Sequence, residues 1–219
     1  MILLVTGGSA SGKSEYAENR ALQLAEAEQR KLIYLATMRP FGEDASKRIE
    51  RHRRLRAGKG FETVERYTDI EGLCHSKSLD SSESESSNEE TFRKKAKGAV
   101  VMLECMSNLT ANEMFSNMDD ENLEGESEKN ESAEAKYNIA KVRERILRGI
   151  DALEQIAGHL VIVSINVFDE GLQQYDPWTQ AYIQCLGGLN QELTRKADEA
   201  VEVVYSIPVP YKEDESCSL

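Results

Sequence analysis

The amino-acid sequence predicts an α/β fold with a doubly wound, mainly parallel sheet flanked by helices. Short aliphatic segments alternate along the chain with longer amphipathic ones, the order expected when parallel strands are joined by helical crossovers. The aliphatic segments contain few polar residues, as expected for strands buried on both faces of a sheet. A glycine-rich loop directly follows the first of them, at a strand-to-helix junction typical of this fold class.

Each expected element has its own local signal. The expected strands are aliphatic runs: Ile2–Thr6, Leu32–Thr37, Ala99–Glu104, Leu160–Ser164 and Val201–Ser206, with Glu62–Glu65 as a weaker candidate. The expected helices are the amphipathic segments between them: Lys13–Gln29, Asp44–Arg56, Tyr137–Ala157 and Pro177–Lys196. The third has apolar residues at helical spacing from Ile139 to Ile156. Pro177 suits a first helical position, with Asp176 as its N-cap.

The negative charge of the chain is concentrated in two segments. The 219 residues carry a formal net charge of −12, from 27 Lys and Arg against 39 Asp and Glu. Residues 76–92 and 116–136 hold most of this excess and are rich in Ser, Glu and Asn. Because such segments bury little apolar surface, we expect flexible acidic insertions in a single domain spanning residues 1–219. The rest of the chain is nearly neutral, so net charge alone says little about its ligands.

The sequence predicts a cytoplasmic protein without a membrane span. No apolar run approaches the roughly 18–20 residues that cross a bilayer. The first residues, Met1–Gly8, lack the basic region of a signal peptide. The four cysteines are scattered without metal-ligand spacing, which favours a reducing compartment.

The glycine-rich loop predicts a phosphate site. Its residues fit the pattern GxxxxGK[ST] between an expected strand and an expected helix: Gly7, Gly8, Ser9, Ala10, Ser11, Gly12, Lys13 and Ser14. Glycines allow the backbone to close on phosphate oxygens, and the helix N-terminus stabilises the anion. Lys13 would reach the β- and γ-phosphates, and the Ser14 hydroxyl would hold Mg²⁺. Glu104, at the end of another strand, would bind the same ion directly or through water, or else is an ordinary strand-end carboxylate.

A basic segment surrounds one histidine. Within Lys47–Arg56, Arg48, His52 and Arg56 share one face of the expected helix. Positive neighbours disfavour the imidazolium, and a neutral imidazole is a nucleophile. Guanidinium groups could hold the polyphosphate that it attacks. The same spacing also allows His52 to lie at the edge of an apolar stripe with Ile49, so both interpretations stay open.

These residues together resemble a known family. The matching segments are Val5–Ser14, Tyr16-Ala-Glu18, Tyr34–Thr37, Arg48-Ile-x-x-His52-Arg53, Thr63–Glu65, Leu103–Met106, Asn112, Leu189–Gln191, Ala197-Asp198 and Ser206–Pro208. The chain resembles the bifunctional adenosylcobinamide kinase and adenosylcobinamide-phosphate guanylyltransferase family of cobalamin biosynthesis. The resemblance implies a RecA-like P-loop domain that uses ATP or GTP to phosphorylate adenosylcobinamide. It then implies transfer of GMP from GTP to the new phosphate, with release of pyrophosphate.

The resemblance also implies a set of site residues and an assembly. The family's guanylylated histidine falls on His52, with Lys13 as the second catalytic residue. Its other nucleotide-contacting positions fall on the loop residues above and on Tyr34, Leu35, Ala36, Arg53, Arg54, Leu55, Arg56, Glu65 and Glu104. The implied metal ligands for Mg²⁺ are Ser14 and Glu104, and the implied assembly is a homotrimer. These small-nucleotide motifs argue against a nucleic-acid partner.

Two segments depart from the family pattern. Ile165-Asn166-Val167-Phe168 stands where the family usually has an Asn-Glu-Val-Gly turn, and Tyr182-Ile183-Gln184 stands where Phe-Arg-Asp is expected. They motivate two alternatives: a P-loop kinase for another alcohol, or a nucleotide-binding regulatory protein without transfer activity.

Overall fold

The protein is built around one seven-stranded sheet. The structure, a computed structural model, describes residues 1–75, 92–115, 131–166 and 175–212, without the side chains of 43–45, 48, 55 and 131–138. The strands in these ranges are β1 (Ile2–Thr6), β2 (Leu32–Ala36), β3 (Glu62–Glu65), β4 (Val100–Glu104), β5 (His159–Val163), β6 (Glu199–Val204) and β7 (Ile207–Lys212). Their order in the sheet is β3-β2-β4-β5-β1-β6-β7. Every neighbouring pair is parallel except β6 and β7, which confirms the predicted α/β class.

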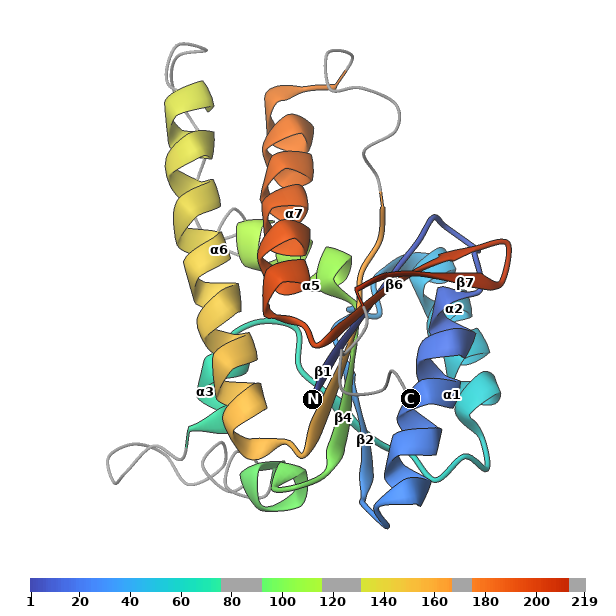
Figure 1. The fold of residues 1–219 in the computed structure, drawn as a ribbon. Coiled ribbons are helices and arrows are strands. Elements are labelled where there is room, and N and C mark those ends of the chain that lie inside the picture. The colour runs from blue at the N-terminus through green and yellow to red at the C-terminus, as the bar shows by residue number, and fades with distance from the viewer. Residues whose placement is uncertain (76–91, 116–130, 167–174, 213–219) are drawn as a thin grey trace.

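Helices cover both faces of this sheet (Figure 1). One face carries α1 (Lys13–Ala27) and α2 (Gly42–Arg56). The other carries α3 (Ile70–Cys74), α5 (Met106–Phe115), α6 (Glu131–Ile156) and α7 (Pro177–Lys196). The sheet is therefore doubly wound, as predicted. None of the helices in the described ranges is both long and apolar enough to cross a membrane.

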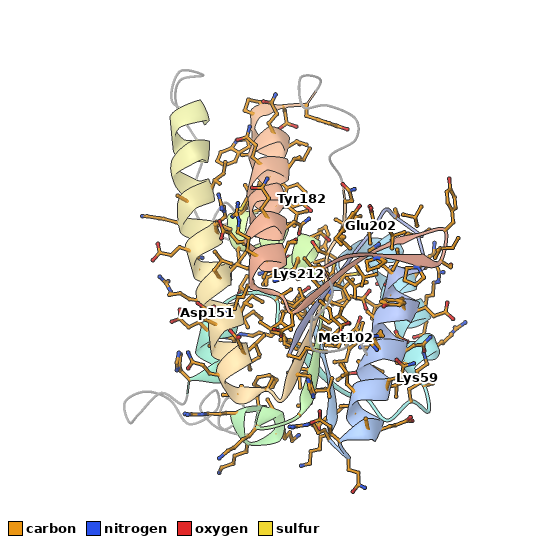
Figure 2. All side chains as sticks on the ribbon, in the orientation of Figure 1. Lys59, Met102, Asp151, Tyr182, Glu202 and Lys212 are labelled. Atoms are coloured by element: carbon orange, nitrogen blue, oxygen red, sulfur yellow. The ribbon has the colours of Figure 1, made fainter. Side chains whose placement is uncertain are left out.

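Side chains of the central strands alternate between two apolar cores. Ile2 and Leu4 of β1 pack under the α6 and α7 helices, whereas Leu3 and Val5 pack against α1. Met102, at the middle of β4, belongs to the core beneath α1 (Figure 2). Because both faces are buried, the strands lack the polar alternation of a half-exposed sheet.

The predicted elements are all present. The bounds of β1, β3 and α7 are as expected, and the other predicted ends differ from the observed ones by at most six residues. The strand expected to end at Ser206 ends at Val204, because Tyr205 and Ser206 have φ values of 50° and 63° and form a turn. The Asp176 cap of α7 is confirmed: its carboxylate accepts from the Trp178 and Thr179 N–H groups, both at 3.0 Å.

Among the described residues, the helices α3 and α5, the helical residues 92–96 and the strand β7 were missed. The helices α3 and α5 have too few apolar residues at helical spacing to be recognised from the sequence. Pro208 and Pro210 argue against a strand in the sequence, but β7 lies at the edge of the sheet, where proline is tolerated. The predicted insertions 76–92 and 116–136 lie mostly outside the described residues. At their margins the prediction was wrong: Phe92 is buried in the core, and residues 131–136 already belong to α6.

Candidate functional site

The glycine-rich loop joins the end of β1 to the start of α1, as predicted. Gly12 caps α1 with a φ of +93°, in the left-handed region that favours glycine. A Cβ there would lie 2.6 Å from the Ser206 hydroxyl oxygen, so the turn between β6 and β7 packs closely on the loop. The Ser206 N–H donates to the Ser11 carbonyl at 2.7 Å and fixes this contact. The loop is thus shaped and supported for an anion at the α1 N-terminus.

Lys13 lies back over this loop. Its ammonium donates to the Gly8 carbonyl at 2.9 Å. Partial burial lowers the pKa of Lys13, and the nearby Cys105 and Glu104 oppose that shift. A phosphate oxygen of a bound triphosphate would replace the Gly8 carbonyl as the partner of this charge.

Glu104 occupies the centre of the site at the end of β4. Its carboxylate accepts from the Ser14 hydroxyl at 2.5 Å through Oε1 and from the Tyr34 hydroxyl at 2.9 Å through Oε2. It is only 9% exposed. Burial, reinforced by the charge of Glu104, raises the pKa of Tyr34 well above its usual value, so the phenol remains a donor. The phosphate loop and the neighbouring strand are therefore joined at one carboxylate.

The pair Ser14 and Glu104 fits a magnesium ion chemically. Mg²⁺ prefers oxygen ligands in octahedral geometry at about 2.0–2.1 Å, which places adjacent ligand oxygens about 3 Å apart. The hydroxyl and carboxylate oxygens are already at about this spacing, 2.5 Å. A small movement would let both oxygens face an ion that also contacts the phosphates.

The helix α2 brings His52 to the same carboxylate. The Nδ1 atom of His52 lies 3.8 Å from Glu104 Oε1. That nitrogen is buried and has no hydrogen-bond partner, although the side chain as a whole is 24% exposed. The histidine therefore lines a pocket together with Glu104 of β4, and Ile49 of the expected apolar stripe lines the same pocket. The phosphate loop reaches this carboxylate through the Ser14 hydroxyl but does not line the pocket itself.

The arginines that follow His52 have different surroundings. Arg56 is 7% exposed, and its guanidinium lies 3.4 Å from the centre of the Tyr34 ring. Its Nε and Nη1 atoms are buried without partners, so they are free to bind an anion in the pocket. Arg53 pairs with Glu65 at 3.0 Å at the pocket rim, and Arg54 pairs with Glu50 on the exposed side of α2.

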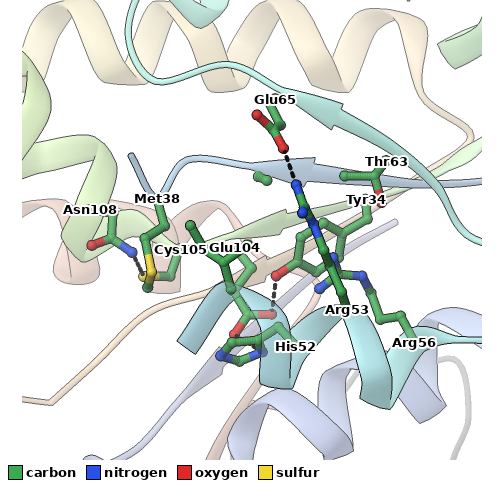
Figure 3. Close-up of a pocket in the computed structure, with 12 residues that line it drawn as sticks. Tyr34, Met38, His52, Arg53, Arg56, Thr63, Glu65, Glu104, Cys105 and Asn108 are labelled. Carbon is green, nitrogen blue, oxygen red and sulfur yellow. Dashed lines mark hydrogen bonds and ion pairs between the residues drawn. The ribbon is translucent and has the colours of Figure 1, made fainter. Parts of the chain in front are cut away.

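His52, Arg56 and Glu104 line one pocket at the carboxyl ends of β2, β3 and β4 (Figure 3). The lining residues are Tyr34, Ala36, Met38, Ile49, His52, Arg53, Arg56, Thr63, Glu65, Glu104, Cys105 and Asn108. A crevice at the carboxyl ends of parallel strands is the usual ligand position in α/β sheets. The structure thus gathers most of the predicted nucleotide-binding residues outside the loop.

Some predicted residues lie elsewhere. Leu35 is fully buried in the core under α6, so only its backbone is near the pocket. Arg54 does not line the pocket, and the side chain of Leu55 lies outside the described part of the chain. The loop residues Gly7–Ser14 also lie outside the lining of the pocket, and the functional roles of all the predicted site residues stay predictions.

Sequence reasoning missed several site residues. Met38 and Asn108 line the pocket without any motif to mark them, and Cys105 was noticed only within the matching segment Leu103–Met106. Cys105 contacts the Ser107 hydroxyl at 2.9 Å, and burial raises the pKa of its thiol, which disfavours a reactive thiolate. Glu18 was noticed only as part of the family resemblance. It is 1% exposed and contacts Lys59 at 2.6 Å.

Comparison with known proteins identifies the family of the chain. The chain is 28% identical over 214 residues to the bifunctional adenosylcobalamin biosynthesis protein CobU of Escherichia coli (strain K12), covering 97% of this chain and 100% of that protein. Two solved structures are similar at a lower level. The ATPase domain of G40P has a TM-score of 0.47 and 11% identity, and the match covers 98% of this chain and 77% of that one. A prototypical ATPase from the type III secretion system of pathogenic bacteria has a TM-score of 0.49 and 12% identity, and the match covers 92% of this chain and 50% of that one. The family model described as cobinamide kinase / cobinamide phosphate guanyltransferase matches residues 3–211. Because this match spans nearly the whole chain and includes every residue of the pocket, the chain belongs to the cobinamide kinase / cobinamide phosphate guanyltransferase family.

Proposed function

We propose that this one pocket carries both reactions of the family, and that His52 is the covalent nucleophile of the second. The first reaction phosphorylates adenosylcobinamide with ATP or GTP, and the second transfers GMP from GTP to adenosylcobinamide phosphate. One observation supports the proposal above the rest: Ser14 of the phosphate loop and His52 of α2 meet at the same carboxylate, Glu104. A triphosphate held by the loop would therefore lie next to the histidine.

The kinase step depends mainly on position and charge. The loop N–H groups, the α1 N-terminus and Lys13 would hold the β- and γ-phosphates in line with the acceptor hydroxyl. The hydroxyl oxygen forms a bond to the γ-phosphorus, the bond to the bridging oxygen breaks, and the hydroxyl proton passes to solvent. Mg²⁺, held by Ser14 and Glu104, would neutralise charge on the phosphates when bound.

The guanylyl step uses the imidazole ring. A nitrogen of His52 forms a bond to the α-phosphorus of GTP, and pyrophosphate leaves with the electrons of the broken P–O bond. A phosphate oxygen of adenosylcobinamide phosphate then attacks the same phosphorus, and the N–P bond breaks to return the electron pair to the ring. The free Nε and Nη1 groups of Arg56 are suited to hold the charge that develops on the phosphates.

Labelled GTP tests this assignment. Wild-type protein incubated with α-labelled GTP and Mg²⁺ should carry acid-labile, alkali-stable label, as a phosphoramidate does. His52→Ala should carry none, whereas His75→Ala, which alters an exposed histidine at the end of α3, should label like the wild type. Wild-type protein that stays unlabelled, or label that persists in His52→Ala, would overturn the assignment.

Three coarser features belong to the same proposal. A single domain carries both activities, and it acts in the cytoplasm, where nucleoside triphosphates are available. The chain assembles as a homo-oligomer, for which a trimer is our expectation. The exposed apolar side chains of the hairpin β6–β7, Tyr205, Ile207, Val209 and Tyr211, support an assembly because single-chain proteins seldom expose such a group together.

A further inference from the structure

Glu18 is a buried carboxylate for which the two reactions above have no use. It lies in the second turn of α1 and is 1% exposed. Its Oε2 atom accepts from the Lys59 ammonium at 2.6 Å, whereas its Oε1 atom is buried without any partner. A buried carboxylate oxygen without a donor costs free energy, so a donor is expected to reach it in the working enzyme.

A ring nitrogen that could donate to Glu18 lies near it. One oxygen of Glu18, one ring nitrogen of His52 and one oxygen of Glu104 all lie within 4.8 Å of one another. His52 Nδ1 is the second buried atom without a partner in this cluster. Glu104 Oε1 lies 3.8 Å from this nitrogen, beyond hydrogen-bond distance, and the Glu104 oxygens already have donors in Ser14 and Tyr34. Glu18 Oε1 is the carboxylate oxygen that remains available.

Glu18 also connects the helix that bears the histidine to the phosphate loop. Lys59 lies in the turn after α2 (Figure 2). Its ion pair with Glu18 ties that end of α2 to α1. A cation shared by Glu18, His52 and Glu104 is disfavoured, because the Lys59 ammonium already neutralises Glu18. A proton on His52 Nδ1 satisfies both unpartnered atoms without adding a second cation.

We infer that Glu18 is a positioning residue for guanylyl transfer: it accepts a hydrogen bond from His52 Nδ1–H, so that Nε2 is the atom guanylylated. This inference rests on the proposed role of His52. When Nε2 bonds to the α-phosphorus, positive charge develops on the ring and the Nδ1 proton stays in place. The Glu18 carboxylate stabilises that charge, as in other sites where a carboxylate orients a catalytic histidine. The ring remains a good leaving group for the second half of the reaction.

Glu18→Gln isolates this role. The single amide oxygen of glutamine can still accept a hydrogen bond from Lys59. The amide NH₂ group then takes the place of the second carboxylate oxygen, and it cannot accept a hydrogen bond from His52 Nδ1–H. We expect the rate of guanylyl-enzyme formation to fall about 10- to 100-fold, the range for loss of one hydrogen bond to a charged group. Kinase turnover should fall far less, by no more than about threefold, since that step does not use the imidazole. Glu15→Gln, the same change at an exposed position of α1, should leave both rates unchanged.

A double variant separates positioning from folding. Glu18→Gln/Lys59→Met leaves no half-buried lysine without a carboxylate partner, so it should fold even if the single variant does not. Its guanylylation should remain as slow as in Glu18→Gln. Guanylylation at the wild-type rate, or an equal fall of both activities, would overturn the positioning role.

Phosphorus NMR of the denatured guanylyl-enzyme tests the attacking atom. We expect the phosphoramidate on Nε2, and a linkage through Nδ1 would overturn the inference. The outcomes also distinguish this inference from the proposed function. Wild-type protein without any guanylyl-enzyme refutes the histidine intermediate itself, whereas equal labelling of wild type and both Glu18 variants refutes the role of Glu18 alone.

Discussion

Replacing Tyr34 with phenylalanine removes one hydroxyl from the centre of the pocket and keeps the ring that packs against Arg56. The lost hydroxyl donates to Glu104 Oε2 at 2.9 Å, and both residues are mostly buried. A hydrogen bond to a charged group contributes about 1.5–3 kcal/mol, and its loss leaves a buried carboxylate oxygen without a donor. We therefore expect Tyr34→Phe to lower the free energy of unfolding by about 1.5–3 kcal/mol.

Thermal unfolding measures this loss. For a chain of this size, about 1 kcal/mol corresponds to about 2–4 °C, so the melting temperature should fall by about 3–12 °C. Tyr205→Phe is the matched control. Tyr205 is 91% exposed, so the Tyr205→Phe protein should melt at the same temperature as the wild type. A Tyr34→Phe protein that melts within about 1 °C of the wild type at neutral pH would refute the contribution assigned to this hydrogen bond.

The pH dependence gives the same prediction a second test. Burial raises the pKa of Tyr34 above its ordinary value of 10.0, so its contribution to stability is complete below that pH and is lost as the pH rises further. Phenylalanine has no proton to lose. The difference in melting temperature between wild type and Tyr34→Phe should narrow above about pH 10, and a difference that widens there would contradict the assigned shift.

Three further substitutions test the loop and the caps. Lys13→Ala should slow both reactions at least about 100-fold in assays of turnover and of guanylyl label, and unchanged kinase activity would refute the phosphate-loop assignment. Gly12→Ala forces a left-handed residue against Ser206, so it should lower the melting temperature and weaken nucleotide binding measured by calorimetry; wild-type values for both would contradict the packing described. Asp176→Ala should lower the melting temperature at neutral pH. A hydrogen bond from Thr179 lowers the pKa of Asp176, so the cap stabilises the protein fully above the ordinary carboxyl pKa of 3.8 and loses this effect as the pH falls below it. The melting temperatures of wild type and Asp176→Ala should therefore converge in acid. A difference in melting temperature that does not change with pH would be evidence against the cap.

Much of the fold could be predicted because strand burial leaves a direct mark on composition. Runs such as Val100–Leu103 are continuous in apolar residues because both of their faces are covered. The edge strand β7 could not be found in this way, since its prolines and exposed side chains resemble a loop. Its existence depends on pairing with β6, which a local pattern does not encode.

The site was predictable where a motif fixes chemistry and position together. The phosphate loop and Glu104 follow strands at defined points, so their meeting could be expected from the parallel order of the sheet. The pattern around His52 allowed two interpretations, and only the packing of α2 places its ring against Glu104. The burial of Glu18 against Lys59 joins residues 41 positions apart and has no local signal at all.

The most direct test of the account is the chemical competence of the guanylyl-enzyme. Wild-type protein is labelled with α-labelled GTP, freed of nucleotide by gel filtration, and mixed with adenosylcobinamide phosphate in a single turnover. We predict that the label leaves His52 and appears in the guanylylated corrinoid at least as fast as steady-state turnover. Label that stays on the protein while turnover with fresh GTP proceeds would contradict the covalent route and with it the central role of His52.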